Sequence, residues 1–248
     1  YKYRITGGNG NRNFTQEITP YLGITYDIGE NHTLYASYTS IFKPQTVKDI
    51  NGKYLDPIQG KDYELGIKGD YFDGALSASF GVFKVVQDKL GAKTGQKIPG
   101  TTTDAYEAKK GVTSKGFEVD VNGEINQNLS LGLGLTHFNA KDADGKKFDT
   151  ESSRTTANLF AKYSIADFRA GAGVQYKSKI YVGSGANEIT QKAYTLANLM
   201  FGYRISKNFD IQLNIDNVFN KKYFEGIGNN KMVYGDPRTF NLGFTYSF

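Results

Sequence analysis

The chain closes on DIQLNIDNVFN (Asp210–Asn220), a glycine-rich basic loop, and PRTFNLGFTYSF (Pro237–Phe248). In the last of these segments, large apolar residues occupy every second position: Phe240, Leu242, Phe244, Tyr246 and Phe248. Small or polar residues fill the positions between them. Because successive side chains of a β-strand point to opposite faces, this alternation predicts a strand with one apolar face and one polar face.

The same alternation recurs along most of the chain, for example in YLGITYDI (Tyr21–Ile28) and LSLGLGLTHF (Leu129–Phe138). About twelve such segments are present, and most reach the ~9–11 residues that a tilted transmembrane strand needs. Short turns such as Asp73–Gly74 alternate with much longer loops such as 43–60 and 88–110. Short turns at one end and long loops at the other are typical of bacterial outer-membrane barrels. The sequence therefore predicts an all-β, antiparallel transmembrane β-barrel domain over residues 1–248.

Charged residues on the polar faces of these strands are expected to line a water-filled interior, where opposite charges can pair. They are Asp27, Glu64, Lys68, Asp70, Glu118, Asp120, Arg169, Lys177, Asp210 and Asp216. A soluble β-sandwich that binds ligands through its loops would also bury one apolar face, so it remains an alternative.

Composition excludes several classes of function. The chain has no cysteine, so neither a disulfide framework nor a thiolate metal site can form. His32 and His137 are the only histidines, and we expect neither a metal centre nor a bound cofactor. No nucleophile, base and orienting group can be assembled from the pattern, so we assign no catalytic residue and expect no enzyme activity. The net charge of +5 is scattered rather than gathered into a stripe, which argues against nucleic-acid binding.

Several motifs resemble the barrel of TonB-dependent outer-membrane receptors. DNVFNKKYF (Asp216–Phe224) followed by YGDPRTFNLGFTYSF (Tyr234–Phe248) is similar to the terminal signature of that family, with Val218 where the family usually has leucine. YASYTSIFKPQ (Tyr35–Gln45), the segment 52–74 and SKGFEVDVNGEI (Ser114–Ile125) resemble its siderophore branch. The combination most resembles ferric-hydroxamate receptors of the coprogen type.

The resemblance implies a barrel of about 22 strands around an N-terminal plug. This chain offers about twelve strands and neither plug nor TonB box, so we expect TonB to act only through a plug outside these residues. The implied location is the bacterial outer membrane. The implied partners are the lipid bilayer with its lipopolysaccharide, the barrel-assembly machinery and a ferric siderophore that carries the iron. A truncated or redesigned closed twelve-stranded barrel, serving as a passive pore or scaffold, is the main alternative.

In this family, aromatic and basic side chains of the loops and upper interior hold the ferric siderophore. The chelate offers oxygen acceptors and apolar linkers, which arginine and tyrosine can meet. The corresponding candidates at the loop end are Arg154, Tyr54, Tyr106, Phe42, His137, Tyr181 and Tyr234. The resemblance also implies that Tyr246 and Phe248 form the C-terminal signal read by the assembly machinery.

Overall fold

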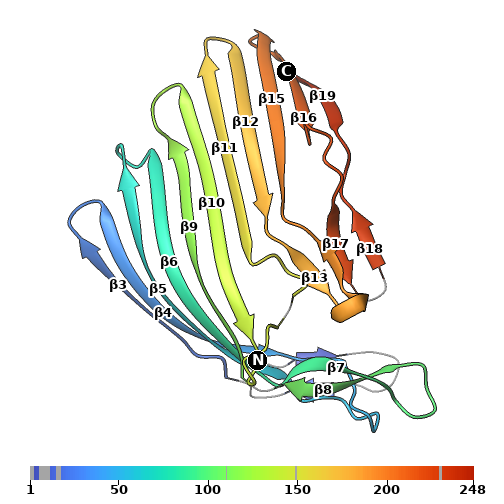
Figure 1. Ribbon diagram of the computed structural model, residues 1–248. Coiled ribbons are helices and arrows are strands. Elements are labelled where there is room, and N and C mark those ends of the chain that lie inside the picture. Colours follow the sequence, from blue (N-terminus) through green and yellow to red (C-terminus); the bar gives the residue numbers. More distant parts are fainter. Residues whose placement is uncertain (1–2, 6–11, 15–17, 110, 149, 229–230) are drawn as a thin grey trace.

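The computed structural model describes residues 3–5, 12–14, 18–109, 111–148, 150–228 and 231–248 (Figure 1). The strands and one short 3₁₀ helix, η1, are β1 (Tyr3–Ile5), β2 (Arg12–Phe14), β3 (Tyr21–Ile28), β4 (His32–Lys43), β5 (Ile58–Tyr71), β6 (Leu76–Asp88), β7 (Leu90–Lys97), β8 (Asp104–Lys109), β9 (Val112–Glu124), β10 (Leu129–Lys141), β11 (Thr155–Ile165), β12 (Phe168–Lys177), β13 (Ile180–Val182), η1 (Gly185–Asn187), β14 (Ile189–Gln191), β15 (Tyr194–Ser206), β16 (Phe209–Asp216), β17 (Phe224–Gly228), β18 (Lys231–Tyr234) and β19 (Thr239–Tyr246). No helix within the described ranges is long and apolar enough to cross a membrane.

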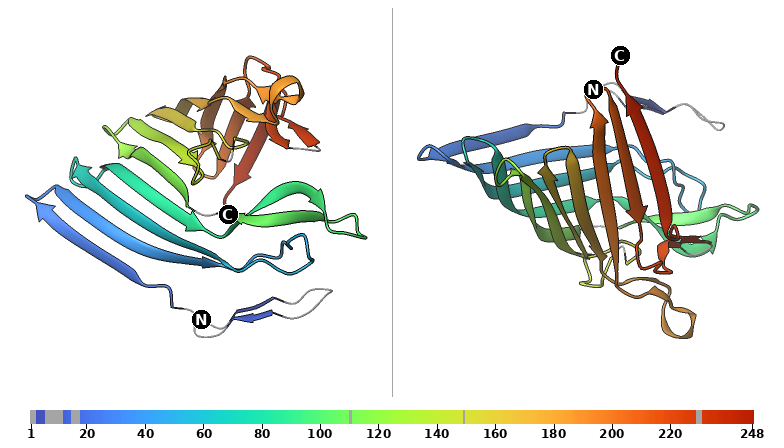
Figure 2. Two further views of the ribbon diagram at one scale, coloured as in Figure 1. Left: turned by 60° about the horizontal axis from the view of Figure 1, so that its bottom comes forward. Right: turned by 90° about the horizontal axis from the view of Figure 1, so that it is seen from above.

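Eleven of these strands form one antiparallel sheet, which we call the wall. Its order is β19-β16-β15-β12-β11-β10-β9-β6-β5-β4-β3. The wall curves into an open trough, with tight turns at one end and long loops at the other (Figures 1 and 2). The predicted antiparallel barrel architecture is confirmed.

The wall differs from the prediction in its number of strands and in its edges. Tyr3–Ile5, inside the expected first strand, pairs with Arg12–Phe14 in a separate hairpin, while residues 1, 2 and 6 of that expected strand lie outside the described ranges. Strands β3 and β19 are the two edges and do not pair with each other. A closed twelve-stranded barrel is therefore not what this chain forms here, because closure requires hydrogen bonds between those edges.

Strand register gives the wall two chemically distinct faces. Between β16 and β19, Leu213 lies opposite Leu242, whereas the adjacent Asn214 lies opposite Asn241. Through alternation, the face of Leu213 is apolar across the wall, and we call it the outer face. The other face, the inner face, borders a cavity of about 660 Å³ that reaches from β9 to β19. Its polar lining includes Asp120, Asn122, Asn158, Gln175, Asn198, Gln212, Asn214, Asp216 and Asn241.

The outer face has no protein packed against it over most of its height. Ile24 is 69% exposed and Phe244 is 62% exposed, although both are large apolar residues. Within the described ranges, the buried apolar residues, such as Ile58, Val112 and Leu196, instead gather near the loop end. A soluble sandwich would bury this apolar face under a second sheet, so that alternative is wrong. Lipid is the environment that suits the outer face.

The turn at Asp73–Gly74 has the geometry expected from its sequence. The N–H of Ala75 donates to the carbonyl oxygen of Phe72 at 3.0 Å. The two central residues have φ values of 55° and 83°, the left-handed region that this tight hairpin turn requires. The turn therefore fixes the register between β5 and β6.

An ion pair joins β12 to β16 on the inner face near the turn end. Arg169 Nη2 contacts both carboxylate oxygens of Asp210, at 2.6 and 2.8 Å. Gly202, on the strand between them, leaves room for this contact, since a Cβ there would lie 2.7 Å from Nη2. The guanidinium therefore lies directly over a glycine.

We expect Arg169→Gln and Asp210→Asn each to destabilise the wall and the double variant to cost less than their sum. Because both side chains are about a quarter exposed, the coupling energy should be about 1 kcal/mol. A double-mutant cycle in urea, with the barrel refolded into lipid vesicles, measures it. Additive effects of the two substitutions would show that the pair contributes nothing.

Candidate functional site

The loop end of the wall is organised into two packed clusters. In the first loop cluster, the segment 44–57 docks against the β7–β8 hairpin. The buried Gln45 joins them: its Nε2 donates to the backbone oxygens of Asp56 and Lys89, and its Oε1 accepts the N–H of Gly91 at 3.1 Å. Lys89 also pairs with Asp56 at 3.2 Å. These contacts hold two segments distant in sequence against each other.

Tyr54 and Tyr106 both belong to the first loop cluster and are linked through Lys48. The N–H of Tyr106 donates to the backbone oxygen of Lys48 at 2.8 Å. The Lys48 ammonium lies 4.7 Å from the centre of the Tyr54 ring. Farther along the hairpin, hydrogen bonds from Lys93 and Lys97 lower the pKa of Asp104 to about 2.

The second loop cluster comprises the β13–β14 and β17–β18 hairpins. Ile180, Val182 and Ile227 form its buried centre, and Phe224 packs against them. The Tyr234 ring packs against the Phe224 ring at an interplanar angle of 47°, with ring centres 4.7 Å apart, and Tyr234 remains 74% exposed. Tyr234 is therefore attached to a packed hairpin and open to solvent.

Next to the second loop cluster, which contributes Tyr181, lies a cavity of about 270 Å³, which we call the rim cavity. It is lined by Asn139, Ala140, Lys141, Lys147, Thr150, Ser152, Arg154, Ser178, Lys179 and Tyr181. They come from the end of β10, from the loop between β10 and β11, and from the segment 178–181 that leads into β13. The structure thus unites two of the sequence candidates, Arg154 and Tyr181, with three lysines.

The rim cavity is basic and rich in hydrogen-bond donors. Arg154 lies with its guanidinium carbon 4.9 Å from the centre of the Phe138 ring, and its Nη2 donates to the backbone oxygen of Phe148. The Lys179 ammonium lies 4.8 Å from the Tyr181 ring and pairs with Glu188 at 3.1 Å. Lys147 and Lys179 are both exposed. This donor set can bind oxygen acceptors of an anionic or oxygen-rich ligand.

Side chains that could hold a metal ion directly form a different kind of site from the rim cavity. In the described part of the chain, no group of three or more histidine or acidic residues is placed to hold a metal ion.

Two further sequence candidates, Phe42 and His137, do not line the rim cavity, although Asn139, which does, has its Nδ2 3.3 Å from His137 Nε2. By register, Phe42 and His137 are on the outer face: Phe42 lies opposite Gln59, and His137 opposite Phe117. The His137 ring also lies 5.6 Å from Phe117, and its Nδ1 is 2.8 Å from Thr155 Oγ1. These contacts place His137 at the upper edge of the apolar face. His137 is two residues from Leu135 and therefore shares its face.

Tyr246 and Phe248 continue the outer face of the edge strand β19. Their rings meet edge to face at 5.2 Å, and both are exposed. Their role as an assembly signal stays a prediction.

Sequence reasoning missed most of the rim cavity. Lys141, Lys147 and Lys179 were assigned only to polar loops, and the hydroxyls of Ser152 and Ser178 were not singled out. The one available signal was their position at strand ends next to Arg154. Sequence reasoning also predicted loops where the structure has the β7–β8, β13–β14 and β17–β18 hairpins.

The signature residues near the chain end contact one another. Asn217 is buried, and its Nδ2 donates to the backbone oxygens of Lys221 and Asp236 at 2.9 and 3.0 Å. The Arg238 N–H donates to Asn220 Oδ1 at 3.0 Å, and its Nη1 donates to the backbone oxygen of Val218 at 3.3 Å. The two halves of the motif therefore close the long connection between β16 and β19.

Comparison with known proteins matches residues 1–218 to the family described as TonB dependent receptor-like, beta-barrel. The chain is 35% identical to the ferric-pyoverdine 358 receptor of Pseudomonas putida, over 93% of this chain and 29% of that protein. It is 31% identical to the ferripyoverdine receptor of Pseudomonas aeruginosa, over 99% of this chain and 32% of that one. The chain thus spans about a third of the length of these relatives.

Solved structures show the same similarity to ferripyoverdine receptors. The crystal structure of the P. aeruginosa ferripyoverdine receptor of the outer membrane, bound to ferripyoverdine, superposes with a TM-score of 0.89 at 30% identity, covering 100% of this chain and 35% of that one. These relatives are receptors rather than enzymes, and the expected outer-membrane location is confirmed. They do not support the narrower expectation of a coprogen-type hydroxamate receptor. By its fold and by the match over most of its length, the chain belongs to the TonB-dependent receptor β-barrel family.

Proposed function

We propose that residues 1–248 form a single wall domain of an outer-membrane receptor that takes up a ferric siderophore of the pyoverdine kind. The observation that carries the proposal is the basic rim cavity. It lies in a chain that is similar to a ferripyoverdine receptor over nearly its whole length. Iron would enter as its siderophore chelate. TonB is the proposed partner that would drive uptake by the whole receptor.

The rim cavity supports this function through its chemistry. At about 270 Å³ it is smaller than a typical site for a whole drug-sized ligand. It suits one edge of a chelate, with Arg154, Lys147 and Lys179 donating to oxygen acceptors and Tyr181 contacting an apolar part. Tyr234 and the aromatic residues of the first loop cluster remain proposed outer contacts.

The inner face supplies a second element of the proposed function. Side-chain amides of Asn158, Asn198 and Gln212 line the large cavity below the rim. Amides both donate and accept hydrogen bonds. A chelate moving along the wall would therefore meet exchangeable polar contacts beside the carboxylates of Asp120 and Asp216.

We expect the double variant Lys147→Gln/Lys179→Gln to weaken binding of a ⁵⁵Fe-loaded pyoverdine about tenfold, since exposed charge-assisted hydrogen bonds are individually modest. The dissociation constant is measured on the detergent-purified receptor that contains this chain. The matched control is Lys207→Gln/Lys222→Gln, which removes two exposed charges from a turn and from the segment between β16 and β17, both outside the rim cavity. Equal affinity of the two double variants would exclude the rim cavity, and no binding by the unmodified receptor would reject the function.

A further inference from the structure

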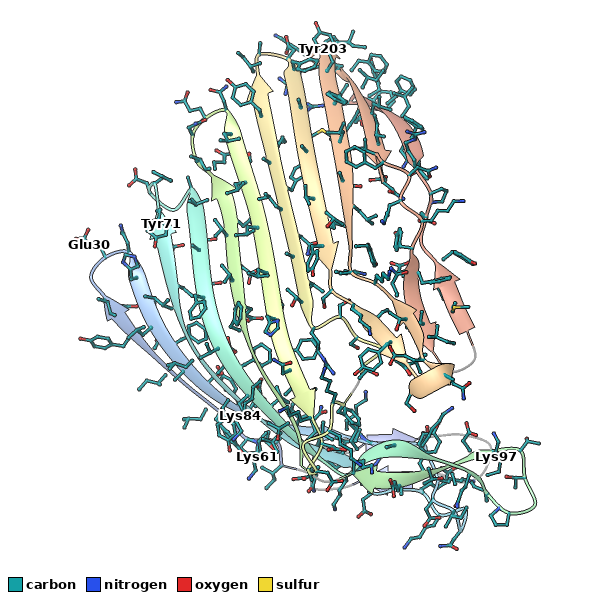
Figure 3. The ribbon with its side chains drawn as sticks, viewed as in Figure 1. Glu30, Lys61, Tyr71, Lys84, Lys97 and Tyr203 are labelled. Carbon is teal, nitrogen blue, oxygen red and sulfur yellow. The ribbon has the colours of Figure 1, made fainter. Side chains whose placement is uncertain are left out.

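The outer face carries a row of lysines near its loop end. Lys61, Lys84, Lys115 and Lys141 come from β5, β6, β9 and β10, which are four consecutive strands of the wall. All four side chains are exposed. Figure 3 places Lys61 and Lys84 near each other at the loop end, with Tyr71 and Tyr203 at the turn end. We call this group the lysine row.

Register assigns the lysine row to the outer face. Lys84 lies opposite Lys115, and it also lies opposite Tyr63 on the other side. On the outer face of β6 Val82 lies next to Lys84 on the turn side, and on β9 Phe117 lies next to Lys115 on the turn side. The row therefore lies where lysines first interrupt the apolar surface toward the loop end, and Val86 is opposite Lys61.

The height of the row on the wall agrees with this boundary. From Leu76, at the turn end of β6, to Lys84 the strand extends about 26 Å at ~3.3 Å per residue. At the usual strand tilt of about 35–45°, this ~26 Å of strand rises about 20 Å, against an apolar band about 25 Å tall. The long lysine side chains can extend toward the loop side and bring their ammonium groups to the lipid headgroups.

Acidic side chains do not neutralise the row. No ion pair involves Lys61, Lys84, Lys115 or Lys141 in the part of the chain that the structure describes. The one carboxylate at the outward positions of these four strands is Asp88 at the loop end of β6, and its Oδ1 accepts the N–H of Gly111 at 2.8 Å. Unpaired cations at this level attract phosphate groups.

A groove lies within the row. It has a volume of about 620 Å³ and is lined by Lys84, Lys115 and Lys141 together with Thr113 and Asn139. The ammonium groups can bind a phosphate, while the hydroxyl and the amide can bind sugar or phosphate oxygens. The row stops at β10, because the next strand, β11, begins at Thr155 opposite His137, one outward position short of the level of Asn139 and Lys115.

We propose that the lysine row is a binding site for a phosphorylated glycolipid headgroup of the outer leaflet, with Lys84 and Lys115 at its centre. The lipid chains would lie against the apolar outer face below, and the phosphates would sit in the groove. The proposal rests on the membrane orientation of the proposed function but not on its siderophore. It turns a general contact with the bilayer into a specific site on one sector of the wall.

The test measures how much phosphorylated glycolipid stays bound to the detergent-purified receptor, using lipopolysaccharide as the probe and mass spectrometry as the readout. Lys61→Gln/Lys84→Gln/Lys115→Gln should weaken retention about a hundredfold, since each basic residue near an anionic lipid surface contributes about fivefold. The matched control is Lys53→Gln/Lys207→Gln/Lys222→Gln, which should retain the glycolipid as the unmodified protein does. Lys141 is left unchanged because it also lines the rim cavity.

Further arms identify the source of the phosphate. Enzymatically dephosphorylated lipopolysaccharide should bind as weakly as the triple variant, and millimolar inorganic phosphate should not displace the intact glycolipid. Unchanged retention in the triple variant, or displacement by inorganic phosphate, would overturn the proposal. If the triple variant fails to fold, the single variants are compared instead: Lys84→Gln should weaken glycolipid retention, and Lys84→Arg should restore it. Siderophore affinity should be the same in all of these variants, which separates this site from the rim cavity.

Discussion

Leu159→Arg is expected to lower the free energy of unfolding in a bilayer by about 2–4 kcal/mol, the cost of a cation on the lipid face near the midplane. Leu159 lies at the middle of β11 on the outer face, between Leu133 and Val174 on the neighbouring strands. It is 44% exposed, because no protein covers it. Lipid cannot hydrate a guanidinium at that depth.

The adjacent residue provides a matched control for this prediction. Asn158 lies on the same strand and faces the large inner cavity, which also contains Asp120 and Asp216. Asn158→Arg should change the free energy of unfolding by less than about 0.5 kcal/mol, as for an ordinary solvated position. Urea titrations of both variants, refolded into the same lipid vesicles, measure the difference. Equal destabilisation would mean that the two faces are wrongly assigned.

Gly66→Ala is expected to cost about 3 kcal/mol, the upper end of the usual penalty for overpacking. Gly66 lies on the inner face of β5, beneath the ring of Tyr35, whose hydroxyl donates to Glu64 at 2.6 Å. A Cβ at Gly66 would lie 2.5 Å from the Tyr35 ring and 2.6 Å from the backbone oxygen of Phe80. The ring can move only by losing its hydrogen bond, and the backbone oxygen cannot move without disturbing β6.

Gly132 is the matched control for Gly66. It also lies on the inner face, on β10, where an added Cβ would meet only the Asn122 side chain at 3.8 Å. Gly132→Ala should leave stability unchanged or raise it by up to about 1 kcal/mol, because alanine restricts the unfolded chain. The same urea titrations compare the two variants. A loss in Gly132→Ala as large as that in Gly66→Ala would show that close approach is not the cause.

Alternation in the sequence predicted the strands and both faces of the wall. It placed Leu242 on the apolar side and Asn241 on the polar side, and the register sets Leu213 and Asn214 of β16 opposite them on the same two faces. Alternation is a local property with a period of two residues, so it can be recognised without knowing which strands are neighbours. The tight turn at Asp73–Gly74 was predictable for the same reason, because glycine and aspartate tolerate the required φ.

Tertiary structure decided which parts of the long loops meet. The β7–β8 hairpin is rich in glycine, threonine and lysine and shows no apolar alternation. Its strands are held by pairing with each other and by Gln45, which is far away in the sequence. Local propensity contains no information about such a contact, so the sequence predicted a loop there.

The sequence by itself determined that this chain is a membrane-facing β wall and, through its motifs, which family it resembles. It could not determine that Arg154 and Tyr181 share a cavity with Lys147, or that Lys84 and Lys115 lie opposite each other. Those placements depend on the register between strands that are separated by long loops. Register is set by backbone hydrogen bonds and packing across the whole sheet, and only the folded wall brings these side chains together.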